Sequence, residues 1–216
     1  MDRPGDVDKT IELLSPLDYP GDLGTAMMKQ MTPFLILILL AASAAAAPPV
    51  RGIAGKKAPS WKVDQWINLE EGLPGVDVDS YSGKVLYLYC FQSWCPGCHS
   101  SGFPTLQSVS QTFTGDEDVA FVAIQTVFEG FRQNTAEKTR EVAEKYSLNM
   151  PIGHSGSPKE RSHVMAAYRT GGTPWTIIID PQGIVRFNDF HIKPLDAVHL
   201  IRKLKPSPAS TKPSDG

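Results

Sequence analysis

Two cysteines separated by two residues are the side chains best suited to chemistry in this sequence. Cys95 and Cys98 flank a Pro-Gly pair, after the hydrophobic run at 84–91 that predicts a buried strand, and at the start of a predicted helix. The amide N–H groups and partial positive charge of a helix N-terminus stabilise a thiolate. We therefore expect an exposed Cys95 to be the nucleophile. Cys98, one helical turn further on the same face, would attack Cys95 to resolve a mixed disulfide.

The elements that must position this pair alternate between strands and helices. Strands are predicted at 84–91, 119–125, 150–153, 175–179 and 184–187. Helices are predicted at 96–113 (kinked near Pro104), 134–146, 161–169 and 195–205. A turn at 180–183 makes the last two strands an antiparallel hairpin. This order predicts an α/β fold with a mixed central β-sheet flanked by helices and a C-terminal β-hairpin and helix.

Local patterns refine two of these helices. Asn134 is the predicted N-cap of its helix, with Glu137 completing a capping box. Glu141 and Lys145 would form an i,i+4 ion pair on that helix. The last helix should bury one apolar face, made of Leu195, Val198, Ile201 and Leu204.

The N-terminal part of the chain predicts export. Residues 34–47 form an uncharged apolar block, shorter than the roughly 20 residues that a helix needs to cross a bilayer. Lys29 precedes the block and small residues end it, which is typical of a signal peptide cleaved after Ala46. The acidic stretch at 1–26 is unusual before such a segment. Either translation begins at Met27 or soon after, or an uncleaved anchor leaves the acidic stretch in the cytoplasm.

Composition divides the chain of 216 residues into three parts. Residues 1–47 are the extension and signal peptide, 48–205 a single domain, and 206–216 a disordered tail without large apolar side chains. The net charge of −2 argues against nucleic-acid binding, which needs a basic surface. Three cysteines are too few for a disulfide-stapled scaffold. The third, Cys90, is expected to be a buried small hydrophobe in the strand.

Several segments resemble the thioredoxin superfamily. They are Phe91-Gln-Ser-Trp-Cys-Pro-Gly-Cys98, Gly171-Gly-Thr-Pro-Trp-Thr-Ile-Ile-Ile-Asp-Pro-Gln-Gly183 and the opening Gly55-Lys-Lys-Ala-Pro59. More narrowly, they resemble the exported disulfide reductases related to TlpA and ResA. The resemblance covers about residues 55–205 and implies a thioredoxin-like fold.

The resemblance also implies roles for individual residues. Cys95 would attack and Cys98 would resolve, so that the two form the redox-active disulfide. A cis peptide bond between Thr173 and Pro174 would place the Thr173 backbone where an extended substrate can pair with it. Independently of the resemblance, the place of Trp94 directly before Cys95 suggests that its ring shields the sulfur and offers a flat contact surface.

The implied activity is that of an exported thiol:disulfide oxidoreductase. It would be a monomer, periplasmic or otherwise extracytoplasmic, that reduces disulfides in exported proteins with cysteine pairs. A membrane-bound dithiol would supply its electrons. We expect no metal, cofactor or nucleic acid to take part.

This sequence departs from its relatives at positions that matter for proton transfer. Thioredoxin has a buried aspartate six residues before the first cysteine, and Tyr89 stands there. ResA-like proteins have a glutamate shortly after the second cysteine, and the stretch at 99–102 has no acid. The proton-handling group is therefore unassigned among His99, Glu129 and a water. Peroxiredoxins have a threonine three residues before the peroxidatic cysteine, where this chain has Gln92.

Two alternatives use the same cysteines as ligands. Cys-x-x-Cys-His is also the attachment motif of c-type haem, in which His99 would be an axial ligand and Met150 or Met165 a second one. The strand before the motif and the α/β pattern favour a dithiol instead. A thioredoxin-like Cu(I) chaperone would bind copper through both thiolates and a distal histidine. His154, His163 and His191 are the candidates for that ligand.

Overall fold

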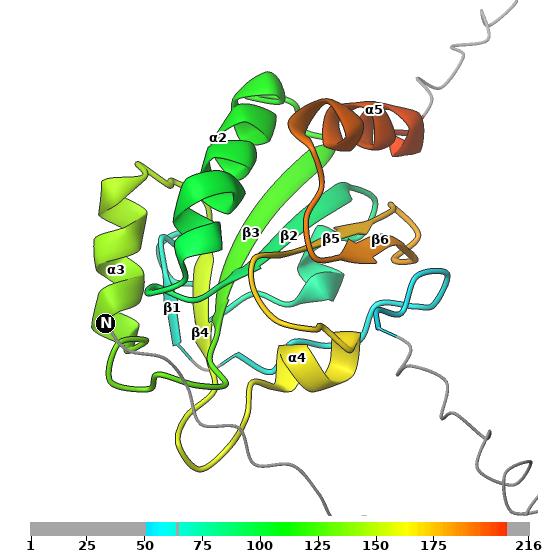
Figure 1. The fold of residues 1–216 in the computed structure, drawn as a ribbon. Coiled ribbons are helices and arrows are strands. Elements are labelled where there is room, and N and C mark those ends of the chain that lie inside the picture. Colours follow the sequence, from blue (N-terminus) through cyan, green and yellow to red (C-terminus); the bar gives the residue numbers. More distant parts are fainter. Residues whose placement is uncertain (1–50, 64, 207–216) are drawn as a thin grey trace, which may run out of the picture. The chain divides into compact units, whose positions relative to one another are not determined.

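A computed structural model describes residues 51–63 and 65–206 of the chain (Figure 1). The predicted signal peptide and nearly all of the predicted tail lie outside these residues, so the predicted boundaries at 47 and 206 stay predictions. Within the described ranges, no helix has the length and apolar character that crossing a membrane requires.

The centre of the fold is a six-stranded mixed sheet in the order β1-β4-β3-β2-β5-β6. Its strands are β1 (Gln65–Ile67), β2 (Val85–Phe91), β3 (Val119–Thr126), β4 (Ile152–Ser155), β5 (Trp175–Ile179) and β6 (Val185–Asp189). Strands β2, β3 and β4 run parallel, while β1, β5 and β6 are antiparallel to their neighbours. The predicted α/β fold with its C-terminal hairpin and helix is confirmed.

Helices cover both faces of this sheet. They are η1 (Val78–Tyr81), η2 (Cys98–Gly102), α2 (Phe103–Thr112), α3 (Ala136–Lys145), α4 (His163–Tyr168) and α5 (Pro194–Leu204). Figure 1 shows α2 and α5 together on one face, with α4 at the opposite side of the sheet. Buried residues of α2, α3 and α5 share one hydrophobic cluster, and those of η1 and α4 share the other.

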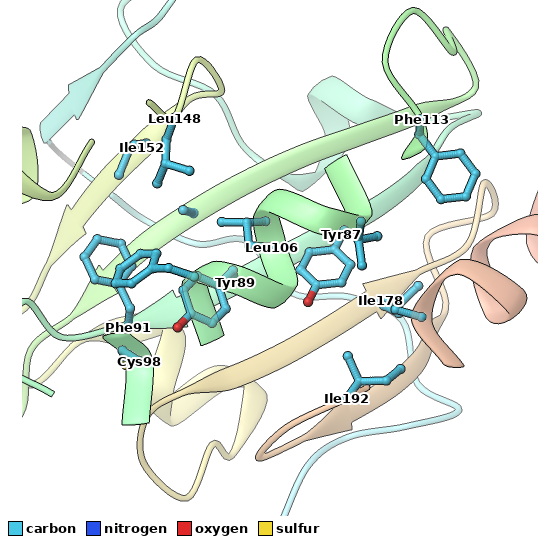
Figure 2. Close-up of a cluster of buried hydrophobic side chains, with 14 of the residues drawn as sticks. Tyr87, Tyr89, Phe91, Cys98, Leu106, Phe113, Leu148, Ile152, Ile178 and Ile192 are labelled. Atoms are coloured by element: carbon cyan, nitrogen blue, oxygen red, sulfur yellow. The ribbon is translucent and has the colours of Figure 1, made fainter. Parts of the chain in front are cut away.

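Strand β2 connects the two clusters, because its side chains alternate between the faces of the sheet. Tyr87, Tyr89 and Phe91 belong to the cluster under α2 and α5 (Figure 2). Leu88 and Cys90 belong to the cluster around α4. Every residue of β2 is buried, so the strand that leads to the cysteine pair is packed against a hydrophobic cluster on each face. Cys90 is fully buried, which confirms its prediction as a core thiol.

The helix after the cysteine pair is interrupted, as predicted, and the interruption is a π-helical segment. Helical backbone begins at Pro96 and passes through η2 into α2, which has Pro104 in its first turn. The amide N–H of Phe103 donates to the carbonyl of Cys98, five residues back. Because Pro104 has no N–H to donate, a wider turn at this point sacrifices no hydrogen bond of that residue.

The predicted details of α3 are wrong. Thr135, not Asn134, is the N-cap, and its side chain accepts from the amide of Lys138. Asn134 is buried instead, where its amide group donates to Gln92 and to carbonyls of the preceding loop. The ion pair on this helix joins Lys138 to Glu141 at 2.6 Å.

Several boundaries also differ from the predictions. Strand β4 lies two residues further along than 150–153, and α4 is shorter than 161–169. Strand β1 and η1 were not predicted at all. In α5, Ile201 is buried as expected, but Leu195 is 82% exposed and Ala197 is buried in its place. The helix begins at Pro194, so Leu195 is the second residue of its first turn.

Asp180 fixes the hairpin that carries β5. Its buried carboxylate accepts from the amides of Gln182 (2.9 Å) and Ile184 (2.8 Å) and from Nε of Arg186 (2.6 Å). We expect Asp180→Ala to lower the free energy of unfolding by about 3 kcal/mol, because it removes all three hydrogen bonds of a buried carboxylate at once. Chemical denaturation measures this.

The control is Glu141→Ala, which removes an exposed ion pair and should cost less than about 1 kcal/mol. Equal losses in the two variants would contradict the role of Asp180 in the turn.

Candidate active site

The two cysteines lie just beyond the end of β2, at the edge where the parallel strands end. The chain leaves β2 at Phe91, turns through 92–95 and enters the helix at Pro96. All three cysteines are free thiols. Cys98 is completely buried, and Cys95 is only 7% exposed. The expectation that Cys95 is exposed is therefore wrong, because neighbouring loops cover most of its side chain.

The Cys95 thiol is surrounded by backbone groups. Its sulfur accepts from the amide of Cys98 at 3.3 Å, which is the helix N-terminal donor expected from the sequence. The thiol donates to the carbonyl of Thr173 at 3.5 Å, across 78 residues of sequence. The Cys95 amide itself donates to the carbonyl of Gln92 and so closes the turn. One sulfur therefore contacts both the helix and the loop before β5.

Cys98 has a different environment. Burial and, to a smaller extent, the neighbouring Cys95 raise the pKa of its thiol to about 12. A hydrogen bond from the backbone at Gln92 and the hydroxyl of Tyr89 act in the opposite direction. In the reduced protein, Cys98 is thus held as a neutral thiol behind Cys95. The two thiols thus differ in burial and in hydrogen bonding, as expected for one cysteine that attacks and one that resolves.

The loop before β5 packs directly on the first helical turns. The peptide bond between Thr173 and Pro174 is cis, as the resemblance implied. A Cβ atom at Gly97 would lie 3.2 Å from Cδ of Pro174. A Cβ atom at Gly102 would overlap the Tyr89 hydroxyl and approach Pro174 to 3.0 Å. Both glycines therefore allow Pro174 to sit against the helix that carries the cysteines.

Trp94 is the exposed member of the predicted site. Its side chain is 45% exposed, and its indole borders the loop at Gly130. A groove of about 380 Å³ opens beside it. The groove is lined by Ser93, Trp94, His99, Arg132, Gln133, Lys138, Glu141, Val142 and Lys145. The charged lining consists of three basic side chains and one acidic one, Glu141, which pairs with Lys138.

His99 is tied into the turn of the active site. Its Nε2 lies 2.6 Å from the carbonyl of Ser93, and its Nδ1 lies 2.7 Å from the hydroxyl of Tyr146. Because a carbonyl can only accept, Nε2 carries the proton and Nδ1 accepts from Tyr146. Both ring nitrogens are occupied, so axial ligation of haem would require His99 to break these bonds. The exposed Glu129 contacts neither thiol through any hydrogen bond in the described structure.

Sequence reasoning missed a polar network beneath the turn. Gln125, fully buried at the end of β3, accepts from the amide of Ser93 at 3.1 Å. Its amide group donates to the carbonyl of Thr135 at 2.9 Å and contacts Nδ1 of His154 at 2.8 Å. Burial lowers the pKa of His154, which favours the neutral ring that this contact needs. A glutamine at the end of a hydrophobic strand is the signal that could have revealed the network.

The predicted copper ligands do not form a cluster with the thiols. Among the residues that the structure describes, no three side chains of His, Cys, Asp or Glu gather as a metal site. His154 is occupied by Gln125, as described above. The donor set for Cu(I) is thus limited to the thiols themselves.

Comparisons with known proteins agree with this geometry. A search of curated proteins gave no match. Among solved structures, a thioredoxin-like superfamily protein is 29% identical, with a TM-score of 0.64 over 70% of this chain and 99% of that one. A thiol-disulfide isomerase from Corynebacterium glutamicum is 25% identical, with a TM-score of 0.61 over 70% of this chain and 98% of that one.

A more distant structure shows the same fold. The thiol:disulfide interchange protein DsbE from Chlorobium tepidum is 19% identical, with a TM-score of 0.53 over 70% and 94% of the two chains. The AhpC/TSA family model matches residues 54–188, a range that includes Gln92 and both cysteines of the pair. Gln92 therefore does not place the protein outside that family. The chain belongs to the AhpC/TSA family and has the thioredoxin-like fold of thiol-disulfide oxidoreductases.

Proposed function

We propose that the protein is an exported thiol:disulfide oxidoreductase, similar to TlpA and ResA, that reduces disulfides in client proteins. The observation that carries this proposal is the unequal pair of thiols beside Pro174. Cys95 is the more exposed of the two, and its sulfur accepts a hydrogen bond from a backbone N–H. Cys98 lies deeper, as a buried neutral thiol. The thiol-disulfide isomerase from Corynebacterium glutamicum, similar over most of its length, supports this class of reaction.

The reaction consists of two exchange steps. The Cys95 thiolate attacks one sulfur of a client disulfide, which forms a Cys95–client disulfide and releases the other client sulfur as a thiolate. Cys98 then attacks the Cys95 sulfur, forms the Cys95–Cys98 disulfide and releases the second client thiol. Two electrons pass to the client, and the proton of Cys98 goes to a departing client sulfur. A membrane-bound dithiol then reduces the Cys95–Cys98 disulfide.

The surface around Cys95 supports a polypeptide client. The carbonyl of Thr173 already accepts from the Cys95 thiol, so the backbone beside Pro174 borders the reacting sulfur. Trp94, the residue before Cys95, presents its half-exposed ring to the groove. The predicted signal peptide supports an extracytoplasmic location, where client proteins carry disulfides. The protein would act there as a monomer.

Replacing each cysteine tests the two steps separately. Cys95→Ser should abolish turnover of a disulfide substrate, because no nucleophile remains. Cys98→Ser should accumulate Cys95–client mixed disulfides, which non-reducing electrophoresis of an exported fraction detects. The double variant is the control, since it should trap nothing. If Cys98→Ser forms no mixed disulfides, the proposed mechanism is wrong.

A parallel assay separates this reaction from peroxide reduction. Consumption of a hydroperoxide by the reduced protein should be slow compared with reduction of a protein disulfide, given Gln92 at the position where peroxiredoxins have threonine. Faster consumption of the peroxide would overturn the proposal.

The groove beside Trp94 predicts a preference for acidic clients. Arg132 and Lys145 line it, and neither forms an ion pair with a carboxylate in the described structure. Reversing both charges, with Arg132→Glu and Lys145→Glu, should lower kcat/KM about fivefold for a peptide disulfide with acidic flanks, because each exposed contact is worth up to about 1 kcal/mol. Added salt should shrink the difference.

The matched control reverses two exposed charges elsewhere, with Lys84→Glu and Lys203→Glu. It should leave kcat/KM unchanged, and both double variants should reduce a small neutral disulfide at the rate of the original protein. An equal loss in both would show that net charge, not the groove, matters.

The buried thiol predicts a pH dependence of stability. The folded pKa of Cys98, about 12, exceeds the ordinary value of 9.0, so the unfolded chain releases this proton first as the pH rises. The stabilisation is therefore present below about pH 9 and is lost between about pH 9 and pH 12. Between about pH 8 and pH 10, the reduced protein should lose about 1 kcal/mol more stability than reduced Cys98→Ala. Denaturation at the two pH values measures it, and parallel curves would contradict it.

A further inference from the structure

Tyr89 lies close enough to Cys98 to lower the pKa of its thiol, but the two-step reaction described above assigns the Tyr89 hydroxyl no role. The residue is 1% exposed, and its hydroxyl has no hydrogen-bond partner among the described residues. A buried polar group without a partner costs free energy, and proteins keep few of them. Phenylalanine would fill the same space without that cost. The hydroxyl therefore calls for an explanation beyond packing.

The position of the ring is fixed by aromatic neighbours. It stacks on Phe91 with centroids 6.0 Å apart and meets the edge of Phe103 at 5.3 Å. Figure 2 shows the Tyr89 oxygen on the side of the ring that faces the segment carrying Cys98. At Gly102, any side chain would overlap this hydroxyl. The glycine thus leaves the room that the oxygen occupies, beside the helical turn that begins at Cys98.

The electrostatics define what this hydroxyl can do. Burial raises the pKa of Tyr89 far above its usual range, and Cys98 raises it further, so the phenol keeps its proton. The other groups that raise it are the Tyr87 phenol on the same strand and the Cys95 thiol. Cys90, on the opposite face of β2, is a further thiol near Cys98. Tyr89 is therefore a neutral donor that faces thiols.

A neutral donor discriminates between the two states of Cys98. A neutral thiol is a weak acceptor, whereas a thiolate is charged and forms a much stronger hydrogen bond with an O–H group. A donor without another partner has no competing bond to break when the thiolate forms. Its contribution is then larger for the thiolate, the state that attacks, than for the resting thiol.

We propose that Tyr89 is a positioning residue for the resolving step, in which its hydroxyl donates to the Cys98 thiolate as that sulfur attacks Cys95. This inference rests on the proposed function. In the step, the Cys98–Cys95 bond forms and the Cys95–client bond breaks. The electron pair leaves with the client sulfur, and the proton from Cys98 goes to that sulfur or to solvent. Tyr89 keeps its own proton throughout.

The test follows the two exchange steps with 5,5′-dithiobis(2-nitrobenzoate), whose thiolate is coloured. Attack by Cys95 releases one equivalent, and resolution by Cys98 releases the second. Cys98→Ser identifies the second phase by lacking it. Tyr89→Phe should leave the first phase unchanged and slow the second about tenfold, the loss expected for a hydrogen bond to a charged group. The pH profile of the second phase should also move to higher pH.

Tyr87→Phe is the matched control. Tyr87 is buried on the same strand and face, and its hydroxyl contacts Thr176 at 3.4 Å instead of the thiols. It should leave both phases and their pH profiles unchanged. Tyr89→Phe should also keep or raise the Tm, because it removes an unpaired buried hydroxyl, so a folding defect would not imitate the kinetic result.

The outcomes separate this inference from the proposed function. If the original protein shows both phases and Tyr89→Phe resolves equally fast with the same pH profile, the role of Tyr89 is wrong and the oxidoreductase proposal stands. If the original protein has no second phase, the proposed function fails first. Equal slowing in both phenylalanine variants would indicate a packing effect and would also overturn the role of Tyr89.

Discussion

The packing of Pro174 against the first turns of the helix is the contact on which the site depends. It joins the end of β2 to the beginning of β5, two segments that the sheet places side by side but the sequence keeps far apart. Gly97 and Gly102 have no side chains, which lets the loop approach closely enough for the carbonyl of Thr173 to accept from Cys95. Larger residues at either glycine would force the helix and loop apart. The close approach of Pro174 therefore explains the glycine between the cysteines, and the start of the helix explains the proline before it.

This packing also makes the two thiols unequal. Cys95 lies where the turn ends, borders the loop and keeps a small exposed surface, whereas Cys98, one turn on, is completely buried. Since the helical rise separates them by a single turn, one sulfur can meet a client while the other stays out of water. In the described structure, the polar groups that contact the two thiols or shift the pKa of Cys98 include backbone amides and carbonyls and the Tyr89 phenol. A negative charge on Cys95 would therefore be stabilised by the amide dipole of Cys98.

The sequence was sufficient to predict those features that depend on local contacts or on a repeating pattern of residue types. Long hydrophobic runs predicted β2, β3 and β5 within a residue, because a strand buried on both faces leaves little choice of residue type. The spacing of Cys95 and Cys98 located the pair. Predictions failed where a residue's role depends on a partner that is distant in sequence. Asn134 is buried against Gln92 and so does not cap α3, and Gln125 bonds to loops on both sides of its strand. A local sequence pattern does not identify such partners.

The surroundings of the two sulfurs also bear on the direction of the reaction. A dithiol becomes a strong oxidant when its reduced form is stabilised, as it is when a thiolate gathers several donors. Here the Cys95 sulfur accepts from a single backbone amide, and burial disfavours the thiolate of Cys98. Burial therefore leaves Cys98 in the reduced pair without the stabilised thiolate that makes a dithiol strongly oxidising. This environment of Cys98 supports the reducing direction of the proposed function.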